Sequence, residues 1–261
     1  MISQATILEW QNIAPWQVDE QIEQDLIISR ILTEIYQSDF LRDRLLFRGG
    51  TALHKLYFPE PLRYSEDLDF VQIKSEPAGP IADEIRKIIE PWLGEAQTDA
   101  RRDSFKMYFR FTPASGQIPE TRIKLEWNTR EHFTLYGIQN IHFGVDTNWY
   151  KGDCSIQTYA LDELAGTKLR ALYQRKKGRD LFDIAELMRR KLIDPGRTVN
   201  AYRKYLDYGG ANVSQREFEL NLKEKLQDPI FLRDMQQLKH ATLEYDPLRA
   251  FESLQPLIAL M

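Results

Sequence analysis

The sequence has little of what disulfide and zinc sites require. Cys154 is the only cysteine among 261 residues, so an intramolecular disulfide framework and a four-cysteine zinc site are both excluded. The four histidines are scattered along the chain without the spacing of metal ligands, at His54, His132, His142 and His240. These absences disfavour a zinc centre and a cysteine–histidine nucleophile.

The sequence also lacks signals for membrane insertion and secretion. No apolar run approaches the roughly 18 residues that a membrane span requires. The first residues, MISQATILEWQ, lack the basic start and the apolar stretch of a secretory signal. We therefore expect a cytoplasmic protein without membrane contact. Proline (12) and glycine (13) are ordinary in number, which favours a globular chain of one large or two smaller domains.

No strong excess of basic charge marks the whole chain as a nucleic-acid binder. The net charge is −4 at pH 7, but it is unevenly divided. Residues 1–159 carry 17 Lys or Arg against 24 Asp or Glu, whereas residues 160–261 carry 18 against 15. This division fits a cation site facing a phosphate-binding surface, although ordinary variation of surface charge explains the same numbers.

The pattern of apolar residues changes near residue 160. Before it, helical spacing at 19–37, 51–57 and 80–94 alternates with strand patterns at 45–48, 66–73, 105–112 and 121–128. Residues 132–159 indicate loop and short strand. After it, helical patterns occupy 161–175, 180–192, 198–208, 214–227, 230–240 and 247–259. We predict an α+β domain with N-terminal helices and a small mixed sheet at 1–159, and a helical domain at 160–261.

A glycine-rich turn follows the strand predicted at 45–48. Gly49 and Gly50 allow a backbone to approach a ligand closely, and the N-terminus of the following helix adds partial positive charge. With the hydroxyl of Thr51, this turn is a candidate for binding nucleotide phosphates. A purely structural turn is the alternative that the pattern alone leaves open.

Three acidic residues lie on two predicted strands. Asp67 and Asp69 share one face of their strand, and two close carboxylates are costly unless a cation neutralises them. Mg²⁺ binds through few carboxylates and completes its shell with water and phosphate oxygens. Glu126, on the polar face of the strand at 121–128, joins the pair if the two strands are neighbours. Such a site suits two-metal nucleotidyl transfer, whereas solvated surface acids are the alternative.

A basic segment lies just after the change of pattern. Lys168 on the first helix of this part could reach a triphosphate, and residues 174–184, QRKKGRDLFDI, carry four basic side chains. Asp180 and Asp183 are three residues apart and therefore share one face of the next helix. Solvated charge and helix capping by Asp180 explain part of this pattern, but Asp183 borders the apolar face.

These motifs in this order resemble the AbiEii-type nucleotidyltransferase toxins, the toxin components of bacterial type IV toxin–antitoxin and abortive-infection systems. The resemblance rests on GGT, RYSEDLDF, IKLEW and LDELAGTKLRALYQRKKGRDLFDI, and it covers residues 45–190. It implies a polymerase-β-like nucleotidyltransferase core followed by a helical part. It also implies transfer of a nucleotide from a nucleoside triphosphate (NTP) with Mg²⁺ or Mn²⁺ as cofactor.

The motif residues fall into three groups. The expected metal ligands are Asp67, Asp69 and Glu126. The residues expected to bind the nucleotide come from the turn, the segment before the acid pair and the two helices: Gly49, Gly50, Thr51, Arg63, Ser65, Lys168, Arg179 and Asp180. The catalytic candidates are Asp67, Asp69, Glu126, Lys168 and Asp183.

Two roles within these groups stay open at this point. Glu126 either completes the metal site or acts as a general base toward the acceptor hydroxyl, and Asp183 positions the nucleobase, the acceptor or Lys168. Fifteen residues separate Thr51 from Asp67, a longer interval than the family motif leads us to expect.

The resemblance implies RNA, such as the acceptor end of tRNA, as the molecule that receives the nucleotide, with inhibition of growth as the result. It implies an AbiEi-type antitoxin encoded nearby, whose direct binding is left open. A small molecule or a protein as the acceptor is an alternative, and so is a non-catalytic nucleotide-binding module. The sequence identifies neither the preferred NTP nor the oligomeric state.

Overall fold

The computed structural model describes residues 2–116, 118–236, 238–240 and 242–261. The chain forms two compact units. Unit 1 comprises Met1–Thr134 and Ile138–Tyr159, and unit 2 comprises Leu135–Gly137 and Ala160–Met261. The assignment of these units as separate domains stays a prediction. Within the described residues, none of the helices has both the length and the apolar composition that crossing a bilayer requires.

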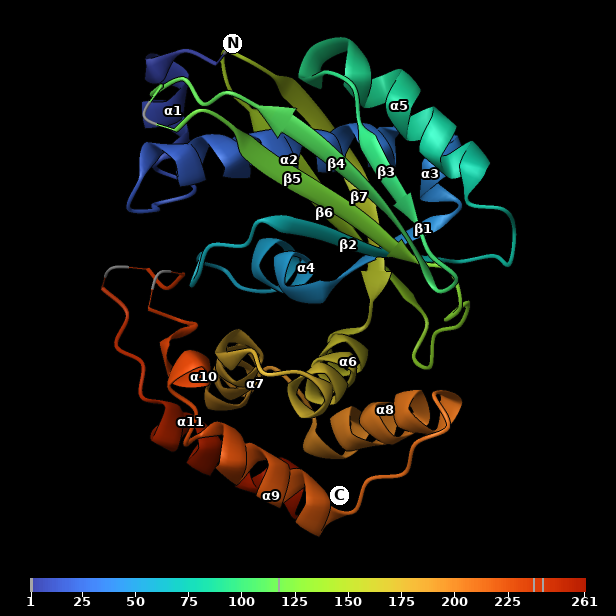
Figure 1. The fold of residues 1–261 in the computed structure, drawn as a ribbon, viewed down its shortest axis with the longest axis vertical. Helices are drawn as coiled ribbons and strands as arrows, with labels where there is room; N and C mark the ends of the chain where they lie inside the picture. The colour runs from blue at the N-terminus through green and yellow to red at the C-terminus, as the bar shows by residue number, and fades with distance from the viewer. Residues whose placement is uncertain (1, 117, 237, 241) are drawn as a thin grey trace. The chain divides into compact units, whose positions relative to one another are not determined.

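In the described part of unit 1, seven strands form a mixed sheet in the order β3-β4-β5-β2-β1-β7-β6 (Figure 1). Their bounds are β1 Leu45–Arg48, β2 Asp67–Gln72, β3 Gln97–Ala100, β4 Ser104–Phe111, β5 Thr121–Asn128, β6 Ile138–Asp146 and β7 Lys151–Tyr159. β2 pairs antiparallel with β1 and parallel with β5. This mixed sheet, together with the helices that follow it, confirms the predicted α+β class.

The central strands form where apolar and polar residues alternate. In β5, Ile123, Leu125 and Trp127 are buried, and the side chains between them are partly exposed. In β2, Leu68 and Phe70 are buried on the face opposite the two aspartates. Burial of the apolar face fixes which side of the sheet carries the polar residues, so the acidic side chains of both strands project from the other side.

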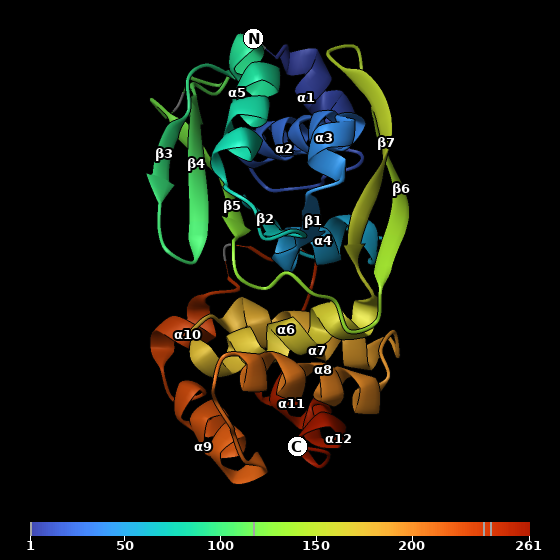
Figure 2. The ribbon, with the colours of Figure 1, turned by 90° about the vertical axis from the view of Figure 1, so that its right-hand side faces the viewer.

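Five helices belong to the described part of unit 1: α1 Gln4–Trp10, α2 Asp19–Gln37, α3 Asp39–Arg42, α4 Gly49–Leu56 and α5 Gly79–Leu93. Ile22, Leu26, Ile31 and Ile35 of α2 recur at helical spacing and are buried. α2 packs mainly on β7 and also contacts α1, α3 and β6. Figure 2 shows α2, α3 and α5 between the outer strands β3 and β4 on one side and β6 and β7 on the other.

The prediction of loop and short strand for residues 132–159 holds for the loop at 132–137 but was wrong for residues 138–159. In place of loop and short strand, β6 and β7 form an antiparallel hairpin of nine residues in each strand. β6 lies at the edge of the sheet, and most of its side chains are exposed. Ile141, Phe143 and Val145 nevertheless alternate with more exposed residues, so this part of the strand was detectable from the sequence.

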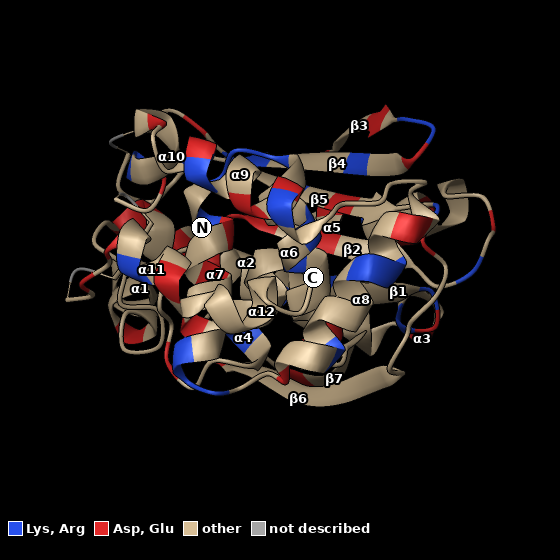
Figure 3. Cartoon of the chain, turned by 90° about the horizontal axis from the view of Figure 1, so that it is seen from below, with Lys and Arg blue, Asp and Glu red and all other residues tan. Residues whose placement is uncertain are grey.

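In its described residues, unit 2 is helical. Its helices are α6 Leu161–Gln174, α7 Gly178–Arg189, α8 Pro195–Tyr208, α9 Gln215–Lys225, α10 Pro229–Arg233, α11 Pro247–Ser253 and α12 Gln255–Ile258. The helix predicted at 247–259 is divided near Leu254, because Pro256 has no backbone N–H and begins a new helix instead. The helix predicted at 230–240 ends at Arg233. Figure 3 shows basic and acidic positions side by side on α9.

A glycine of the recognised motif brings two helices of unit 2 together. A Cβ added at Gly166 of α6 would lie 2.6 Å from the Cβ of Ala201 and 2.8 Å from the backbone nitrogen of Tyr202, both in α8. Only glycine permits this approach. Nearby, the buried carboxylate of Glu163 accepts hydrogen bonds from the backbone nitrogens of Leu135 (2.8 Å) and Tyr136 (2.9 Å), which holds the segment 135–137 in unit 2.

Candidate active site

The three predicted metal ligands lie side by side on the sheet of unit 1. β2 and β5 are parallel neighbours, and their register places Asp69 opposite Glu126 and Asp67 opposite Lys124. Because side chains alternate between the faces of a strand, all four project from the same face. We call Asp67, Asp69 and Glu126 the acid cluster. The neighbouring strands that the sequence argument required are therefore present.

Two ammonium groups contact the acid cluster. The Nζ atom of Lys124 lies 3.2 Å from Asp67 Oδ2 and 3.1 Å from Glu126 Oε2. The Nζ atom of Lys106, on β4, lies 3.5 Å from Glu126 Oε1. Neither lysine was predicted as a site residue. Lys124 was detectable, because it lies two residues before Glu126 on the same polar strand face.

Burial and charge act differently on two members of the cluster. Burial raises the pKa of Asp69; neighbouring Lys124 opposes this shift and the charge of Asp67 adds to it. Burial also disfavours the charged form of Glu126, but the ammonium groups of Lys124 and Lys106 hold its pKa below the usual value. The carboxylates on this face of the sheet therefore repel one another and require nearby cations to stay ionised together.

The glycine turn packs directly against the acid cluster. Gly49 begins α4 with φ of 82°, a conformation that favours glycine. A Cβ at this position would lie 2.6 Å from Asp69 Oδ2 and 3.0 Å from Asp69 Cβ. Gly50 follows in the first turn of α4. The N-terminus of α4, with its partial positive charge, therefore lies beside the carboxylate of Asp69.

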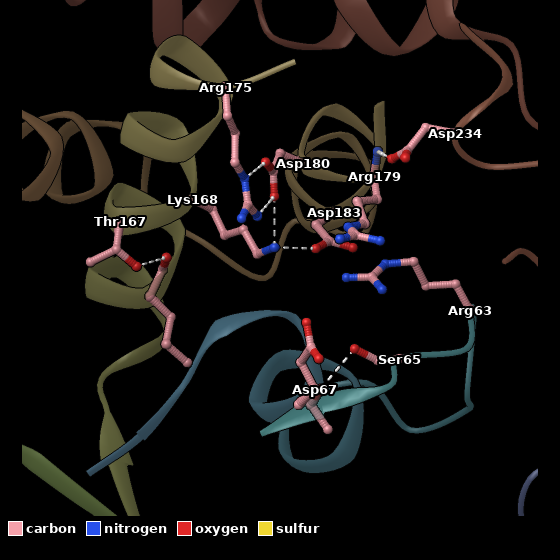
Figure 4. Close-up of polar contacts among 12 residues, drawn as sticks. Arg63, Ser65, Asp67, Thr167, Lys168, Arg175, Arg179, Asp180, Asp183 and Asp234 are labelled. Atoms are coloured by element: carbon pink, nitrogen blue, oxygen red, sulfur yellow. Dashed lines mark hydrogen bonds and ion pairs between the residues drawn. The ribbon is translucent and has the colours of Figure 1, made fainter. Parts of the chain in front are cut away.

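Thr51 and Ser65 connect the turn to the start of β2. The Thr51 hydroxyl donates a hydrogen bond to the backbone oxygen of Asp67 and lies 2.7 Å from the Ser65 hydroxyl. Because the single proton of Thr51 goes to Asp67, the Ser65 hydroxyl donates to Thr51. The fifteen intervening residues therefore comprise the rest of α4 and a loop at 57–66 that returns to the turn. Ser65 and Asp67 are shown in Figure 4.

Two arginines of unit 1 are also near these residues. Arg48, the last residue of β1, lies opposite Asp69 in the sheet, and its Nη1 atom is 2.7 Å from Glu131 Oε2. Arg48 was not predicted as a site residue. Arg63 is buried and donates from Nη1 to the backbone oxygen of Tyr64 at 3.1 Å.

Three predicted nucleotide-binding residues border a cavity of about 220 Å³ within unit 1. They are Thr51, Arg63 and Ser65, and the cavity wall also includes Trp10, Trp16 and Phe58. The cavity therefore combines polar groups from the loop before β2 with aromatic rings from the N-terminal segment and the end of α4.

The predicted residues of α6 and α7 form a buried ionic network in unit 2. The Nζ atom of Lys168 lies 2.9 Å from Asp180 Oδ1 and 2.8 Å from Asp183 Oδ2 (Figure 4). Arg175 adds two contacts to Asp180, from Nε at 2.6 Å and from Nη2 at 2.8 Å. Arg179 donates its backbone N–H to Asp234 at 3.0 Å. The structure thus brings together Lys168, Asp180 and Asp183.

Charge outweighs burial at Asp180. Burial disfavours the carboxylate, but Lys168 and Arg175 together lower the pKa of Asp180 to about 2. The carboxylate is consequently ionised under all ordinary conditions. It fixes the ammonium of Lys168 from one side while Asp183 fixes it from the other.

The family model of the AbiEii nucleotidyltransferase toxins of type IV toxin–antitoxin systems matches residues 30–255. The chain belongs to this family. The resemblance found in the sequence motifs is confirmed, and the chain is a nucleotidyltransferase of this toxin family. The matched region also includes residues 30–44 and 191–255, which the motifs did not cover.

Solved structures share the fold at low sequence identity. JHP933 from Helicobacter pylori is 18% identical, with a TM-score of 0.59 over 93% of this chain and 92% of that one. MenT4, a nucleotidyltransferase toxin from Mycobacterium tuberculosis H37Rv, is 16% identical, with a TM-score of 0.58 over 100% and 99%. No curated protein sequence matches the chain. At these identities, the similarity shows that this AbiEii-family chain has the fold of both proteins.

The AbiEii-family acid cluster suits a divalent cation in the chemistry of its donors. Its carboxylate oxygens are the hard ligands that Mg²⁺ and Mn²⁺ prefer, and Lys124 already places a positive charge between Asp67 and Glu126. Among the described residues, however, no three acidic, histidine or cysteine side chains are grouped closely enough to form a metal site as they stand. The side chains would have to move together to bind a metal.

Proposed function

We propose that this chain transfers a nucleotide from an NTP to RNA, such as the acceptor end of tRNA, with Mg²⁺ or Mn²⁺ as cofactor, and that the transfer inhibits growth. The observation that carries this proposal is the placement of Asp69 opposite Glu126 on neighbouring strands, with Gly49 packed against Asp69. Membership of a nucleotidyltransferase toxin family supports the reaction class.

In this proposal, Asp67, Asp69 and Glu126 hold the metal. When bound, the metal neutralises charge on the triphosphate and stabilises the leaving group. Of the two roles considered for Glu126, its contacts favour that of a ligand, because both of its carboxylate oxygens already face ammonium groups. The pairing of β2 with β5 fixes the backbone positions from which these carboxylates project, so only their side chains have to move to converge on a metal.

The turn at Gly49 and Gly50 is proposed to hold phosphate oxygens. Backbone N–H groups at the start of α4 point along the helix axis, and the helix dipole favours an anion there. Thr51 and Ser65 contribute by fixing this turn to the first residue of β2, Asp67. Arg63, which is buried in the same loop, is retained as a nucleotide-binding candidate.

In unit 2, Lys168 is proposed to contact phosphate, and Asp183 to position it. An ammonium has three N–H donors, so Lys168 can bind an additional oxygen while both carboxylates hold it in place. This geometry supports Lys168 as the group that Asp183 positions, one of the three roles considered for that acid. The nucleotide-binding roles of Arg179 and Asp180 stay predictions.

The partner proposed for this toxin is an AbiEi-type antitoxin encoded nearby, since the family belongs to type IV toxin–antitoxin systems. Co-expression with the neighbouring gene would test this. Rescue of growth supports the pairing, and continued growth arrest contradicts it.

The decisive experiment incubates the purified protein with each α-labelled NTP in turn, Mg²⁺ and total RNA, and then separates RNA, protein and small molecules. We expect label in RNA with at least one NTP, and none after chelation of the metal. Label in protein or in a small molecule instead would support the other acceptors. Absence of label in every fraction, with all four NTPs, contradicts nucleotidyl transfer by this chain.

A further inference from the structure

Lys124 occupies the middle of the acid cluster. Its ammonium lies within 3.2 Å of Asp67 Oδ2 and 3.1 Å of Glu126 Oε2, so it joins carboxylates from two neighbouring strands. The sheet itself determines this position, because the register pairs Lys124 with Asp67 and the alternation of β5 places Glu126 on the same face. Lys124 is therefore an integral part of the cluster.

The second lysine of this face makes a weaker contact. Lys106 reaches only Glu126, at 3.5 Å, and uses the other carboxylate oxygen, Oε1. The three carboxylates of the cluster and the two ammonium groups that contact it carry one formal negative charge in sum, apart from Arg48, which pairs with Glu131. Without Lys124, two formal negative charges would remain, and the contact between Asp67 and Glu126 through a shared cation would be lost.

A divalent metal would use the same oxygens as Lys124. Mg²⁺ binds carboxylate oxygens at about 2.0–2.1 Å and tolerates little departure from octahedral geometry. An ammonium between the same two oxygens would both occupy their lone pairs and repel the metal. The long flexible stem of lysine, in contrast, allows its ammonium to move several ångströms without any change in the backbone.

We propose that Lys124 is an internal counter-cation of the acid cluster, which holds Asp67 and Glu126 together in the metal-free protein and gives way when a divalent metal binds. Lysine pairing and metal binding then exclude each other, so the cost of displacing Lys124 weakens the apparent affinity for metal. Occupancy of the site consequently depends on the concentration of free metal. The inference rests on the proposed function only in taking the acid cluster as the metal site.

Chemical labelling of lysines tests the displacement directly and without turnover. The wild-type protein is treated with an amine-acetylating reagent, with and without Mn²⁺ and in the absence of NTP, and labelling is followed by mass spectrometry. We expect the labelling rate of Lys124 to rise severalfold with Mn²⁺. The exposed Lys151, which pairs with Asp146 outside the cluster, serves as an internal control and should not change. An unchanged or slower rate at Lys124 overturns the proposal.

Calorimetric titration with Mn²⁺, again without NTP, tests the competition. We expect Lys124→Met to bind Mn²⁺ roughly five- to tenfold more tightly than wild type, because the partly exposed ion pairs of Lys124 with Asp67 and Glu126 no longer have to be broken. Lys106→Met is the matched control and should change the affinity less. Lys124→Gln is measured if the methionine variant fails to fold. Equal or weaker binding by the Lys124 variant, or an equal gain in both variants, contradicts the proposal.

The outcomes also separate this inference from the proposed function. Binding of Mn²⁺ to the wild-type protein without any response of Lys124 would refute the counter-cation role and leave the metal-dependent function intact. Absence of Mn²⁺ binding in both the wild type and the Lys124 variant would refute both.

Discussion

Two lysines of this protein each lie between two carboxylates, in surroundings that differ sharply. In unit 2, the side chain of Lys168 is 7% exposed and its partners Asp180 and Asp183 are 0% exposed. In unit 1, the side chain of Lys124 is 22% exposed, and those of Asp67 and Glu126 are 31% and 25% exposed. Both contacts pair an ammonium with two carboxylates, but only the groups around Lys124 are accessible to water.

This difference separates a permanent ion pair from an exchangeable one. Removing one partner of a buried pair leaves a charge without solvent or counter-ion, so the network of Lys168 has to stay intact. A pair near the surface contributes little to stability, because water screens it and can replace either partner. The cluster on β2 and β5 can therefore exchange its cation, which a metal-binding site must do.

Loss of the buried cation should have the largest effect. We expect Lys168→Met to lower the free energy of unfolding by about 3–5 kcal/mol, because Asp183 and Asp180 are left buried with less compensation. Urea denaturation followed by circular dichroism measures this change. A loss of under about 1 kcal/mol, typical of an exposed pair, would remove the distinction between the two lysines.

Acid titration should reveal the buried network as well. The pKa of Asp180 is lowered to about 2 in the folded protein, below its value in the unfolded chain. Its stabilising contribution is therefore complete above the unfolded value of about 4, and it is lost as the pH falls toward 2, by roughly 2 kcal/mol in total. Asp180→Asn should flatten this part of the stability curve. An equally steep curve in the variant would show that other groups cause it.

The packing of the turn against the acid cluster should give an intermediate effect. Gly49→Ala combines a positive φ with a contact of 2.6 Å to Asp69, so we expect a loss of about 1–2 kcal/mol in stability. The transfer rate of the folded Gly49→Ala variant should also fall, because the added Cβ forces the carboxylate of Asp69 to shift. Gly116→Ala is the matched control for backbone strain alone, because Gly116 has φ of 66° and a Cβ added there would have no described atom within 4 Å outside the adjacent residues. Equal loss of activity in both variants contradicts the role of the turn.

The smallest effect is expected from the exchangeable lysine. Lys124→Met should change the free energy of unfolding of the metal-free protein by under about 1 kcal/mol, because the pair is partly solvated. Thermal unfolding of this variant and of Lys168→Met under the same conditions completes the comparison. A loss at Lys124 as large as the loss at Lys168 would mean that both lysines are structural.

Local patterns in the sequence were sufficient for the centre of the sheet. Alternation of Ile123, Leu125 and Trp127 with polar residues identified β5, and similar patterns identified β1, β2 and β4. The edge strand β6 also alternates, at Ile141, Phe143 and Val145, and was overlooked. Alternation is not required where the side chains on both faces of a strand are exposed, and such a strand cannot be found in this way. β3, which is only four residues long and mostly exposed, shows this limit most clearly.

In the candidate site too, the residue types could be predicted from the sequence, but the contacts between distant segments could not. The acid cluster could be predicted from the residue types, but the pairing of Asp69 with Glu126 depends on strand order, which a local pattern does not determine. The contact of Thr51 with Asp67 joins residues separated by the rest of α4 and a ten-residue loop at 57–66, and local patterns could not predict it either. Lys124 was visible two residues before Glu126, yet its significance emerges only from the position of β2.

Nucleotide transfer at the acid cluster can be tested directly by removing one of its carboxylates. Single-turnover transfer of label from the preferred NTP should be measured for the wild type, for Asp69→Asn and for Asp146→Asn, an exposed acid at the end of β6. We predict that Asp69→Asn reduces the rate by about 10³-fold or more while its fold stays intact, and that Asp146→Asn transfers at the wild-type rate. A well-folded Asp69→Asn variant that transfers at the wild-type rate would contradict the account.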